Sequence, residues 1–164
     1  MPSVRANGLD VDYIVDGAGP PLVLLHGASS SGAADFAAQI PHYRTAFRCY
    51  APDARGHAAT RWDAADGFRY AWLVDDLEAF ADVLGLETFH LLGFSMGALT
   101  ALGFAVRRPE RLLTLVVVGL TTQREPRASV ARRLFDPVRI TQHDPRWAEE
   151  LSARHDPVQG VGAW

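Results

Sequence analysis

The chain has 164 residues, of which 48% are hydrophobic and 21% charged, and its formal net charge is −3. These values are typical of one soluble globular domain and exclude a strongly basic surface for nucleic acids or anionic membranes. The longest apolar run, residues 112–120, is too short to span a bilayer. The single Cys49 excludes an internal disulfide and a multi-cysteine metal site. The first residues lack the apolar segment of a signal peptide, so we expect a cytoplasmic protein.

The first third of the chain predicts mainly strands. Asn7-Gly8 is a hairpin turn signal between two short extended stretches. In the second stretch, residues 11–15 alternate between apolar and polar side chains, which is typical of a half-buried strand. Residues 22–25 and 47–51 are apolar and predict two buried strands, with a short helix predicted at residues 33–40.

The middle of the chain alternates between helix and strand signals. One apolar face indicates a helix over residues 70–84, and it consists of Leu73, Leu77, Phe80 and Leu84. Residues 89–92 and 112–118 predict buried strands, and residues 96–106 between them predict a buried helix. Continuously apolar strands that alternate with helices predict an α/β fold, in which a mostly parallel sheet has helices on both faces.

The last part of the chain loses its strand signals. Asp-Pro occurs at residues 136–137, 144–145 and 156–157. Asp as the N-cap with Pro at the first helical position marks the start of a helix. We therefore expect short helices, the third of which has barely begun at residue 164, and a chain that is truncated after its sixth strand. The predicted division is a core over residues 1–120 and the start of a helical lid over residues 121–164. Three aromatic side chains of the lid could line an apolar pocket or simply pack: Phe135, Trp147 and Trp164.

The pentapeptide Gly93-Phe94-Ser95-Met96-Gly97 has the pattern G-x-S-x-G. It follows an apolar strand and opens an apolar helix, which is the setting that a nucleophile elbow requires. A tight turn crowds the residues two before and two after the serine, and Gly93 and Gly97 remove the side chains that would clash. The helix N-terminus favours negative charge near the serine hydroxyl. We therefore predict that Ser95 is a nucleophile.

A second motif, His26-Gly27-Ala28, follows the strand at residues 22–25. Acyl transfer creates an oxyanion, which backbone N–H groups can stabilise. We predict that the N–H of Met96, directly after the nucleophile, is one donor and that the N–H of Ala28 is the other. His26 could be the catalytic base instead, but a histidine that opens such a loop more often holds its shape. We assign His26 and Gly27 to a supporting loop.

A third motif, Pro-Asp-Ala-Arg-Gly-His, occupies residues 52–57, where Asp53 and Arg55 could form a structural ion pair. The segments H-G-A, P-D-A-R-G-H and G-F-S-M-G-A, in this order, resemble the α/β-hydrolase superfamily over residues 2–120. The resemblance implies that Asp53 and Arg55 support a loop near the active site. This chain departs from the family loop in having Ala58 where the family has a glycine.

The resemblance also implies a catalytic Asp or Glu and a histidine base, both after the nucleophile in chain order. His143 and His155 are the histidines that follow Ser95, and each lies beside an Asp-Pro helix start in the lid. Surface or packing roles suit both better than catalysis. We therefore expect the acid and the base beyond residue 164.

Together the motifs predict a serine hydrolase that cleaves a carboxylic ester or lactone through an acyl-enzyme, with no cofactor and no metal. Carbon–carbon bond hydrolases and haloperoxidase-like enzymes of the same fold keep the serine and remain alternatives, as does a non-catalytic fragment or binding module. Haloalkane dehalogenases and epoxide hydrolases resemble this core but use a carboxylate nucleophile. The expected partner is a small ester-like molecule. Residues 1–164 alone are expected to be inactive and to self-associate through an open sheet edge at residues 112–118.

Overall fold

The computed structural model describes residues 1–63, 65, 67–120 and 136–162. Its centre is one six-stranded sheet in the order β1-β2-β4-β3-β5-β6. The strands are β1 (Ser3–Ala6), β2 (Leu9–Asp16), β3 (Pro21–Leu25), β4 (Arg48–Pro52), β5 (Phe89–Phe94) and β6 (Leu112–Val118). Strands β4, β3, β5 and β6 run parallel, whereas β1 and β2 are antiparallel additions at one edge. The predicted mostly parallel sheet is confirmed.

The hairpin between β1 and β2 follows from two residues. Asn7 and Gly8 have φ values of 47° and 77°. Two successive residues in the left-handed region give a two-residue turn whose twist matches that of the flanking strands. Ala6 therefore pairs directly with Leu9. The hairpin turn predicted at Asn7-Gly8 is confirmed.

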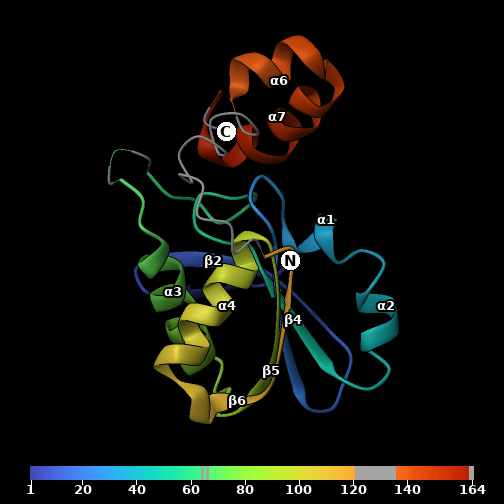
Figure 1. The fold of residues 1–164 in the computed structure, drawn as a ribbon, viewed down its shortest axis with the longest axis vertical. Coiled ribbons are helices and arrows are strands. Elements are labelled where there is room, and N and C mark those ends of the chain that lie inside the picture. The colour runs from blue at the N-terminus through green and yellow to red at the C-terminus, as the bar shows by residue number, and fades with distance from the viewer. Residues whose placement is uncertain (64, 66, 121–135, 163–164) are drawn as a thin grey trace.

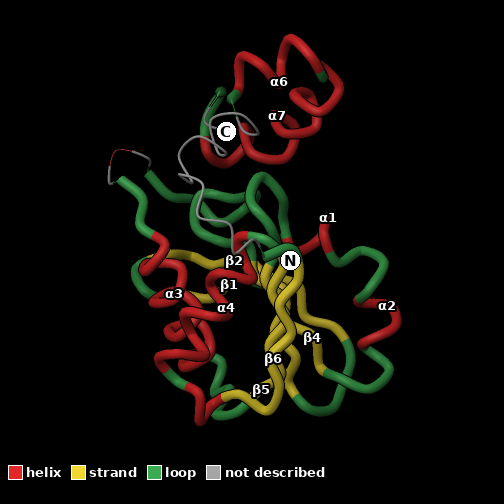
Figure 2. The backbone as a smooth tube through the Cα atoms, in the orientation of Figure 1, coloured by secondary structure: helices red, strands yellow, loops and turns green. Residues whose placement is uncertain are grey.

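Helices cover both faces of the sheet, as predicted (Figures 1 and 2). Helices α3 (Tyr70–Val83) and α4 (Met96–Arg107) lie on one face, and the short α1 (Gly32–Asp35) and α2 (Ile40–Tyr43) lie on the other. The larger core, between the sheet and the two long helices, includes the fully buried Val23, Phe80, Phe89, Leu91 and Phe104. A smaller core beneath α1 and α2 includes Leu24, Phe36 and Cys49. None of the helices in the described residues has the length and apolarity that crossing a bilayer requires.

The helix predicted over residues 33–40 is wrong in extent. The segment forms two single turns, α1 and α2, separated by residues 36–39. Pro41 lies in the first turn of α2, where the missing N–H of proline costs nothing. Inside one continuous helix the same proline would remove a hydrogen bond and clash with the preceding turn, so the helix restarts here.

Two of the three Asp-Pro pairs begin a helix, as predicted. The Asp136 carboxylate caps α6 (Pro137–His143) by accepting from the N–H of Val138 at 3.0 Å. The Asp144 carboxylate caps α7 (Pro145–Gln159) by accepting from the N–H of Trp147 at 3.0 Å. Trp147 packs against the small core between the two helices, whereas Phe135 and Trp164 lie outside the described residues.

The third predicted helix start is wrong, because Pro157 lies inside the last turn of α7. The carboxylate of Asp156 does not cap a new helix and accepts from the N–H of Gly162 at 3.2 Å instead. A proline near a helix end disturbs few hydrogen bonds. His155 and Gln159, on either side of it, are both bound to the core and hold the helix in place.

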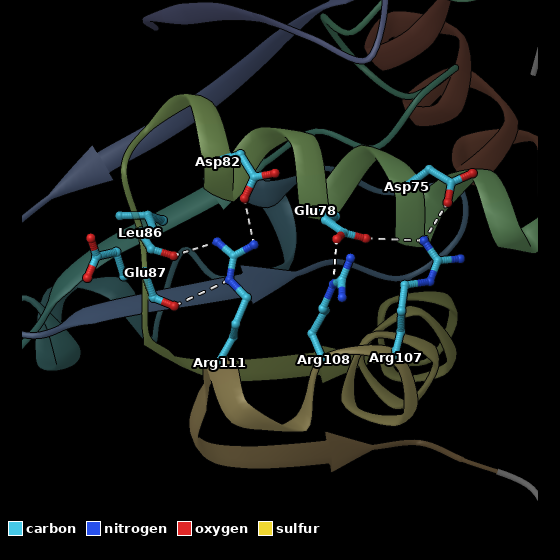
Figure 3. Close-up of polar contacts among 8 residues, drawn as sticks. All are labelled: Asp75, Glu78, Asp82, Leu86, Glu87, Arg107, Arg108 and Arg111. Atoms are coloured by element: carbon cyan, nitrogen blue, oxygen red, sulfur yellow. Dashed lines mark hydrogen bonds and ion pairs between the residues drawn. The ribbon is translucent and has the colours of Figure 1, made fainter.

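Arginines at the end of α4 and in the following turn η2 (Pro109–Arg111) tie this segment to α3 (Figure 3). The ion pairs are Arg107–Asp75, Arg107–Glu78, Arg108–Glu78 and Arg111–Asp82. Their N···O distances are 2.5, 3.3, 2.6 and 2.6 Å, in that order. Partly exposed pairs of this kind each contribute at most about 1 kcal/mol. Their structural consequence is that the C-terminal end of α4 is held against α3.

Strand β6 is the edge of the sheet and is paired on one side with β5. Its apolar side chains are exposed to an unusual degree, and the most exposed are Leu113, Val116, Val117 and Val118. An open apolar edge is a surface on which another chain can pair. The prediction of an exposed edge at residues 112–118 is confirmed, and its self-association stays a prediction.

Candidate active site

Ser95 stands at the turn between β5 and α4. Its φ is 52° and its ψ is −110°, outside the regions that L-residues ordinarily adopt. Backbone strain of this kind costs about 1–3 kcal/mol and persists only where the surrounding structure enforces it. The Ser95 N–H donates to the Val118 carbonyl at 2.8 Å, and its hydroxyl makes no capping hydrogen bond. Among the described residues the hydroxyl has no hydrogen-bond partner, and it lies at the positive end of the α4 dipole.

Gly93 and Gly97 allow backbone to pack against backbone around this turn. A Cβ on Gly93 would overlap the carbonyl of Gly97, and a Cβ on Gly97 would overlap the backbone of Leu25 on β3. The N–H of Gly97 donates to the carbonyl of His26 at 3.1 Å. Because the neighbours are main-chain atoms, no change of rotamer could relieve either overlap. The steric reason for both glycines is the one that the motif spacing predicts.

The loop after β3 lies directly against this turn, since a Cβ on Gly27 would be 3.4 Å from the Cβ of Ser95. The N–H of Gly27 is used by the carboxylate of Asp35 at 2.8 Å. Neither the N–H of Ala28 nor that of Met96 has an acceptor among the described residues. Met96 is the first residue of α4, whose first N–H groups have no partner within the helix. Both predicted oxyanion donors are uncommitted, and their convergence on one point stays a prediction.

His26 is fully buried and has both ring nitrogens engaged. Nε2 accepts from the N–H of Ala54 at 2.9 Å, and Nδ1 lies 2.7 Å from the carbonyl of Gly27. Because a backbone N–H can only donate, Nε2 is unprotonated and Nδ1 carries the hydrogen. Burial lowers the pKa of His26, so the ring is neutral. His26 links the loops after β3 and β4 and leaves no nitrogen for the Ser95 proton, which fits the supporting role that the sequence favours.

Asp53 is buried and holds two backbone segments. Its carboxylate accepts from the N–H of Gly32, at the start of α1, at 2.9 Å and from the N–H of Ala59 at 3.4 Å. Burial raises the pKa of Asp53, an effect that these hydrogen bonds oppose. The side chain braces the loop after β4 against α1, again a supporting role.

The ion pair that the sequence allows between Asp53 and Arg55 does not form. Arg55 instead makes two 2.6 Å hydrogen bonds to the carboxylate of Asp76 on α3. Its guanidinium also lies over the ring of Trp72, 5.1 Å from the centroid. Asp76 precedes Leu77 on the buried face of the helix. A carboxylate on that apolar face is a sequence signal that could have identified the partner, because a buried charge requires a countercharge.

Three histidine rings stand in a row, of which those of His26 and His155 are buried and that of His57 is partly buried. The ring centroids of His26 and His57 are 5.2 Å apart, and those of His57 and His155 are 5.7 Å apart. Burial, reinforced by His26, lowers the pKa of His57 to about 3, and burial also lowers the pKa of His155. The Nδ1 of His155 accepts from the N–H of Ala58 at 3.0 Å. Ala58 has a φ of 41°, the left-handed conformation that explains the glycine of the family loop.

Helix α7 lies over the loops that follow β3 and β4 (Figure 1). Arg154 donates to the carbonyl of Ser29 at 2.8 Å. Gln159 donates to the carbonyl of Thr60 at 2.9 Å and accepts from the N–H of Trp62 at 3.2 Å. Nothing in the sequence pattern singles out either Arg154 or Gln159. Their contacts place part of the predicted lid directly over the candidate site.

All six histidines of the chain lie in the described residues, and none of them hydrogen-bonds to the hydroxyl of Ser95. His42 and His143 are exposed on α2 and α6. His90 lies on β5, where its ring bonds to Thr114 at 2.8 Å. The described residues also contain no group of three His, Cys, Asp or Glu that could hold a metal ion. The turn at Ser95 is therefore built without a histidine hydrogen-bonded to the serine hydroxyl.

Comparison with known families identifies the family to which the chain belongs. Residues 20–154 match the family described as alpha/beta hydrolase fold. The chain is an α/β-hydrolase. This membership rests on most of the chain and agrees with the strand order, the turn at Ser95 and the helices on both faces of the sheet.

Curated relatives of this α/β-hydrolase carry several activities in their names. The chain is 34% identical over 109 residues to the uncharacterized carboxylesterase nap of Bacillus subtilis, covering 61% of this chain and 33% of that protein. It is 36% identical over 115 residues to a 2-hydroxy-6-oxononadienedioate/2-hydroxy-6-oxononatrienedioate hydrolase of Paraburkholderia phymatum, covering 68% of this chain and 40% of that protein. The chain thus spans about two fifths of the length of such relatives.

Among solved structures, Est816, an N-acyl homoserine lactone degrading enzyme, superposes with a TM-score of 0.73 at 23% identity. That superposition covers 98% of this chain and 67% of Est816. A mutant epoxide hydrolase from Bacillus megaterium gives a TM-score of 0.75 at 22% identity, over 93% of this chain and 58% of that one. These likenesses concern the fold of the α/β-hydrolase alone.

Proposed function

We propose that the whole protein is a serine hydrolase of carboxylic esters or lactones, with Ser95 as its nucleophile. The observation that carries the proposal is the conformation of Ser95, a non-glycine residue at φ 52° between a strand and a helix N-terminus. Gly93 and Gly97 make this conformation possible, and the uncommitted N–H of Met96 lies directly beside it. Strain that surrounding backbone holds at one partly exposed serine is typical of a functional site.

In the proposed mechanism the Oγ of Ser95 attacks the carbonyl carbon of the substrate, and its proton passes to a histidine base. The carbonyl π electrons move to oxygen, and the N–H groups of Ala28 and Met96 donate to this oxyanion. Collapse of the tetrahedral intermediate breaks the carbon–oxygen bond, and the base returns the proton to the leaving alkoxide. Water, deprotonated by the same base, then hydrolyses the acyl-enzyme and regenerates Ser95.

The base and the acid that orients it are, in this proposal, supplied by residues outside 1–164. The support is that His26, His57 and His155 pack in a row and each engages a backbone group through Nδ1 or Nε2. The Nε2 of His155 has no partner among the described residues, but it carries the hydrogen, because Nδ1 accepts from the N–H of Ala58. A serine hydroxyl without a base is a weak nucleophile. We therefore expect residues 1–164 alone to show no Ser95-dependent ester turnover.

A second candidate is a carbon–carbon bond hydrolase. It is favoured by the 36% identity to a hydrolase named for 2-hydroxy-6-oxo dienoate-type compounds. Such a reaction would use the same serine and oxyanion donors and would differ in its leaving group, a carbanion equivalent in place of an alkoxide. A carboxylate nucleophile of the epoxide hydrolase type is disfavoured, because Ser95 occupies the centre of the turn.

The test compares the whole protein with its Ser95→Ala variant on p-nitrophenyl butyrate, an N-acyl homoserine lactone and a 2-hydroxy-6-oxo dienoate. We expect turnover of an ester or lactone that is lost in Ser95→Ala and retained in Ser3→Ala, an exposed serine on β1. Ala28→Pro removes one oxyanion donor and is expected to lower kcat by about 10²–10³. Ester turnover that survives Ser95→Ala contradicts the proposal, and turnover of the dienoate alone favours the second candidate.

A further inference from the structure

The β3–α1 loop, residues 26–31, carries the proposed oxyanion donor Ala28 and is held from below by one carboxylate. Asp35 of α1 accepts from the N–H of Gly27 at 2.8 Å and from the hydroxyl of Ser30 at 2.5 Å. Its two oxygens therefore bind the residue before Ala28 and the residue two after it. The Asp35 side chain thereby holds the loop on both sides of Ala28.

The same loop is held from above by the lid. Arg154 of α7 donates to the carbonyl of Ser29 at 2.8 Å, across 125 residues of sequence. Ser29 has a φ of 60°, a left-handed conformation that costs an L-residue roughly 1–2 kcal/mol. The guanidinium of Arg154 makes no ion pair among the described residues, so this carbonyl is its one hydrogen-bonded acceptor there. A strained peptide next to the donor is thus anchored by a charged group.

We propose that Asp35 and Arg154 are positioning residues that clamp the β3–α1 loop so that the N–H of Ala28 faces the oxyanion. This inference rests on the proposed function. An oxyanion donor acts only if it lies about 2.7–3.1 Å from the developing charge, so a small rotation of the Ala28 peptide removes its effect. Asp35 also occupies the N–H of Gly27, which leaves the N–H of Ala28 as the free donor of the pair.

Because Arg154 belongs to α7, the clamp is complete only when that helix is docked. The loop between β3 and α1 rises toward the underside of α7 (Figure 1). His155 and Gln159 hold the last turns of the same helix on the loop after β4. Docking of the lid and formation of the oxyanion site are therefore one event. The docked helix thereby acts on the rate of the chemical step.

The test measures kcat, KM and the thermal unfolding midpoint of the whole protein with Asp35→Ala, Asp35→Asn and Arg154→Met. Two matched controls remove an exposed charge from the same kinds of residue: Asp75→Asn on α3 and Arg146→Met on α7, whose side chain is 89% exposed. We expect Asp35→Ala and Arg154→Met to lower kcat by about tenfold or more, with KM and the unfolding midpoint little changed. Asp35→Asn keeps one acceptor oxygen and is expected to lie between wild type and Asp35→Ala.

Wild-type kcat in both Asp35→Ala and Arg154→Met overturns the inference, as does an equal loss of kcat in Arg146→Met. Amide hydrogen exchange at Gly27, measured without substrate, gives a readout that is independent of catalysis. Its protection should fall in Asp35→Ala and stay in Asp75→Asn, and unchanged protection in Asp35→Ala also overturns the clamp. A protein whose activity survives Ser95→Ala would instead refute the proposed function, and the exchange result would still decide whether the clamp exists.

Discussion

Substituting Gly97 by alanine tests how tightly the structure constrains the turn at Ser95. The added Cβ would overlap the carbonyl carbon and oxygen of Leu25, which are fixed by pairing of β3 with its neighbours. Relief requires the first turn of α4 to move roughly 1 Å away from β3, a displacement that can cost about 10²-fold in rate when it misplaces a catalytic group. The same movement stretches the 3.1 Å hydrogen bond from the Gly97 N–H to the His26 carbonyl.

The expected loss of stability follows from these two effects. Overpacking against a rigid neighbour costs about 1–3 kcal/mol, and a weakened backbone hydrogen bond adds about 1 kcal/mol. We therefore expect Gly97→Ala to lower the free energy of unfolding by about 2–4 kcal/mol. With an m-value of about 2 kcal/mol/M in urea, the midpoint should fall by about 1–2 M.

Gly103→Ala is the matched control, since it adds the same methyl group to the same helix. There the Cβ would meet only the Cγ2 methyl of Val74, at 2.8 Å, and a side chain can adjust. Alanine also has a higher helix propensity than glycine by about 1 kcal/mol, so Gly103→Ala should remain within about 1 kcal/mol of wild type. Equal urea midpoints for the two variants would refute the steric account of the turn.

Three further predictions follow. Arg55→Met should lower the free energy of unfolding by about 3–5 kcal/mol, because it leaves the buried Asp76 carboxylate without its countercharge. Arg5→Met, at an exposed ion pair, should lower it by less than about 1 kcal/mol. Equal urea midpoints for the two variants would refute this. Because burial lowers the pKa of His57 from 6.5 to about 3, the unfolded chain binds the proton first as pH falls. The free energy of unfolding should thus decline as pH falls below 6.5, by up to about 1.4 kcal/mol per pH unit. The decline should be less steep in His57→Asn. A free energy of unfolding that stays constant down to pH 4 would contradict the burial of His57. Residues 1–164 alone should form dimers or larger species through β6 in light scattering, and Val116→Lys should restore the monomer; a wild-type monomer would contradict this.

The sequence predicts the parallel strands well because each is a mostly apolar run with few alternative placements. The strand predicted at residues 112–118 has the observed bounds, and the helix predicted at residues 96–106 is observed as Met96–Arg107. One of the errors occurs where distant contacts decide the outcome. Asp156-Pro157 reads locally as a helix start, yet Gln159 binds carbonyls 99–101 residues away and keeps α7 intact.

In the candidate site, too, local signals can be predicted from the sequence and distant contacts cannot. Ser95, Gly93 and Gly97 are readable from the sequence, because their requirement is a local steric one. Asp35 and Arg154 carry no local pattern, because their partners on the β3–α1 loop are defined only once the chain has folded.

The central claim is that Ser95 is the nucleophile, and mass spectrometry after covalent labelling tests it most directly. The whole protein is incubated with a fluorophosphonate, digested, and searched for the phosphonylated peptide. The account predicts one adduct, on Ser95, that forms in Ser3→Ala and is absent in Ser95→Ala. An adduct on another residue, or labelling that persists undiminished in Ser95→Ala, would contradict it.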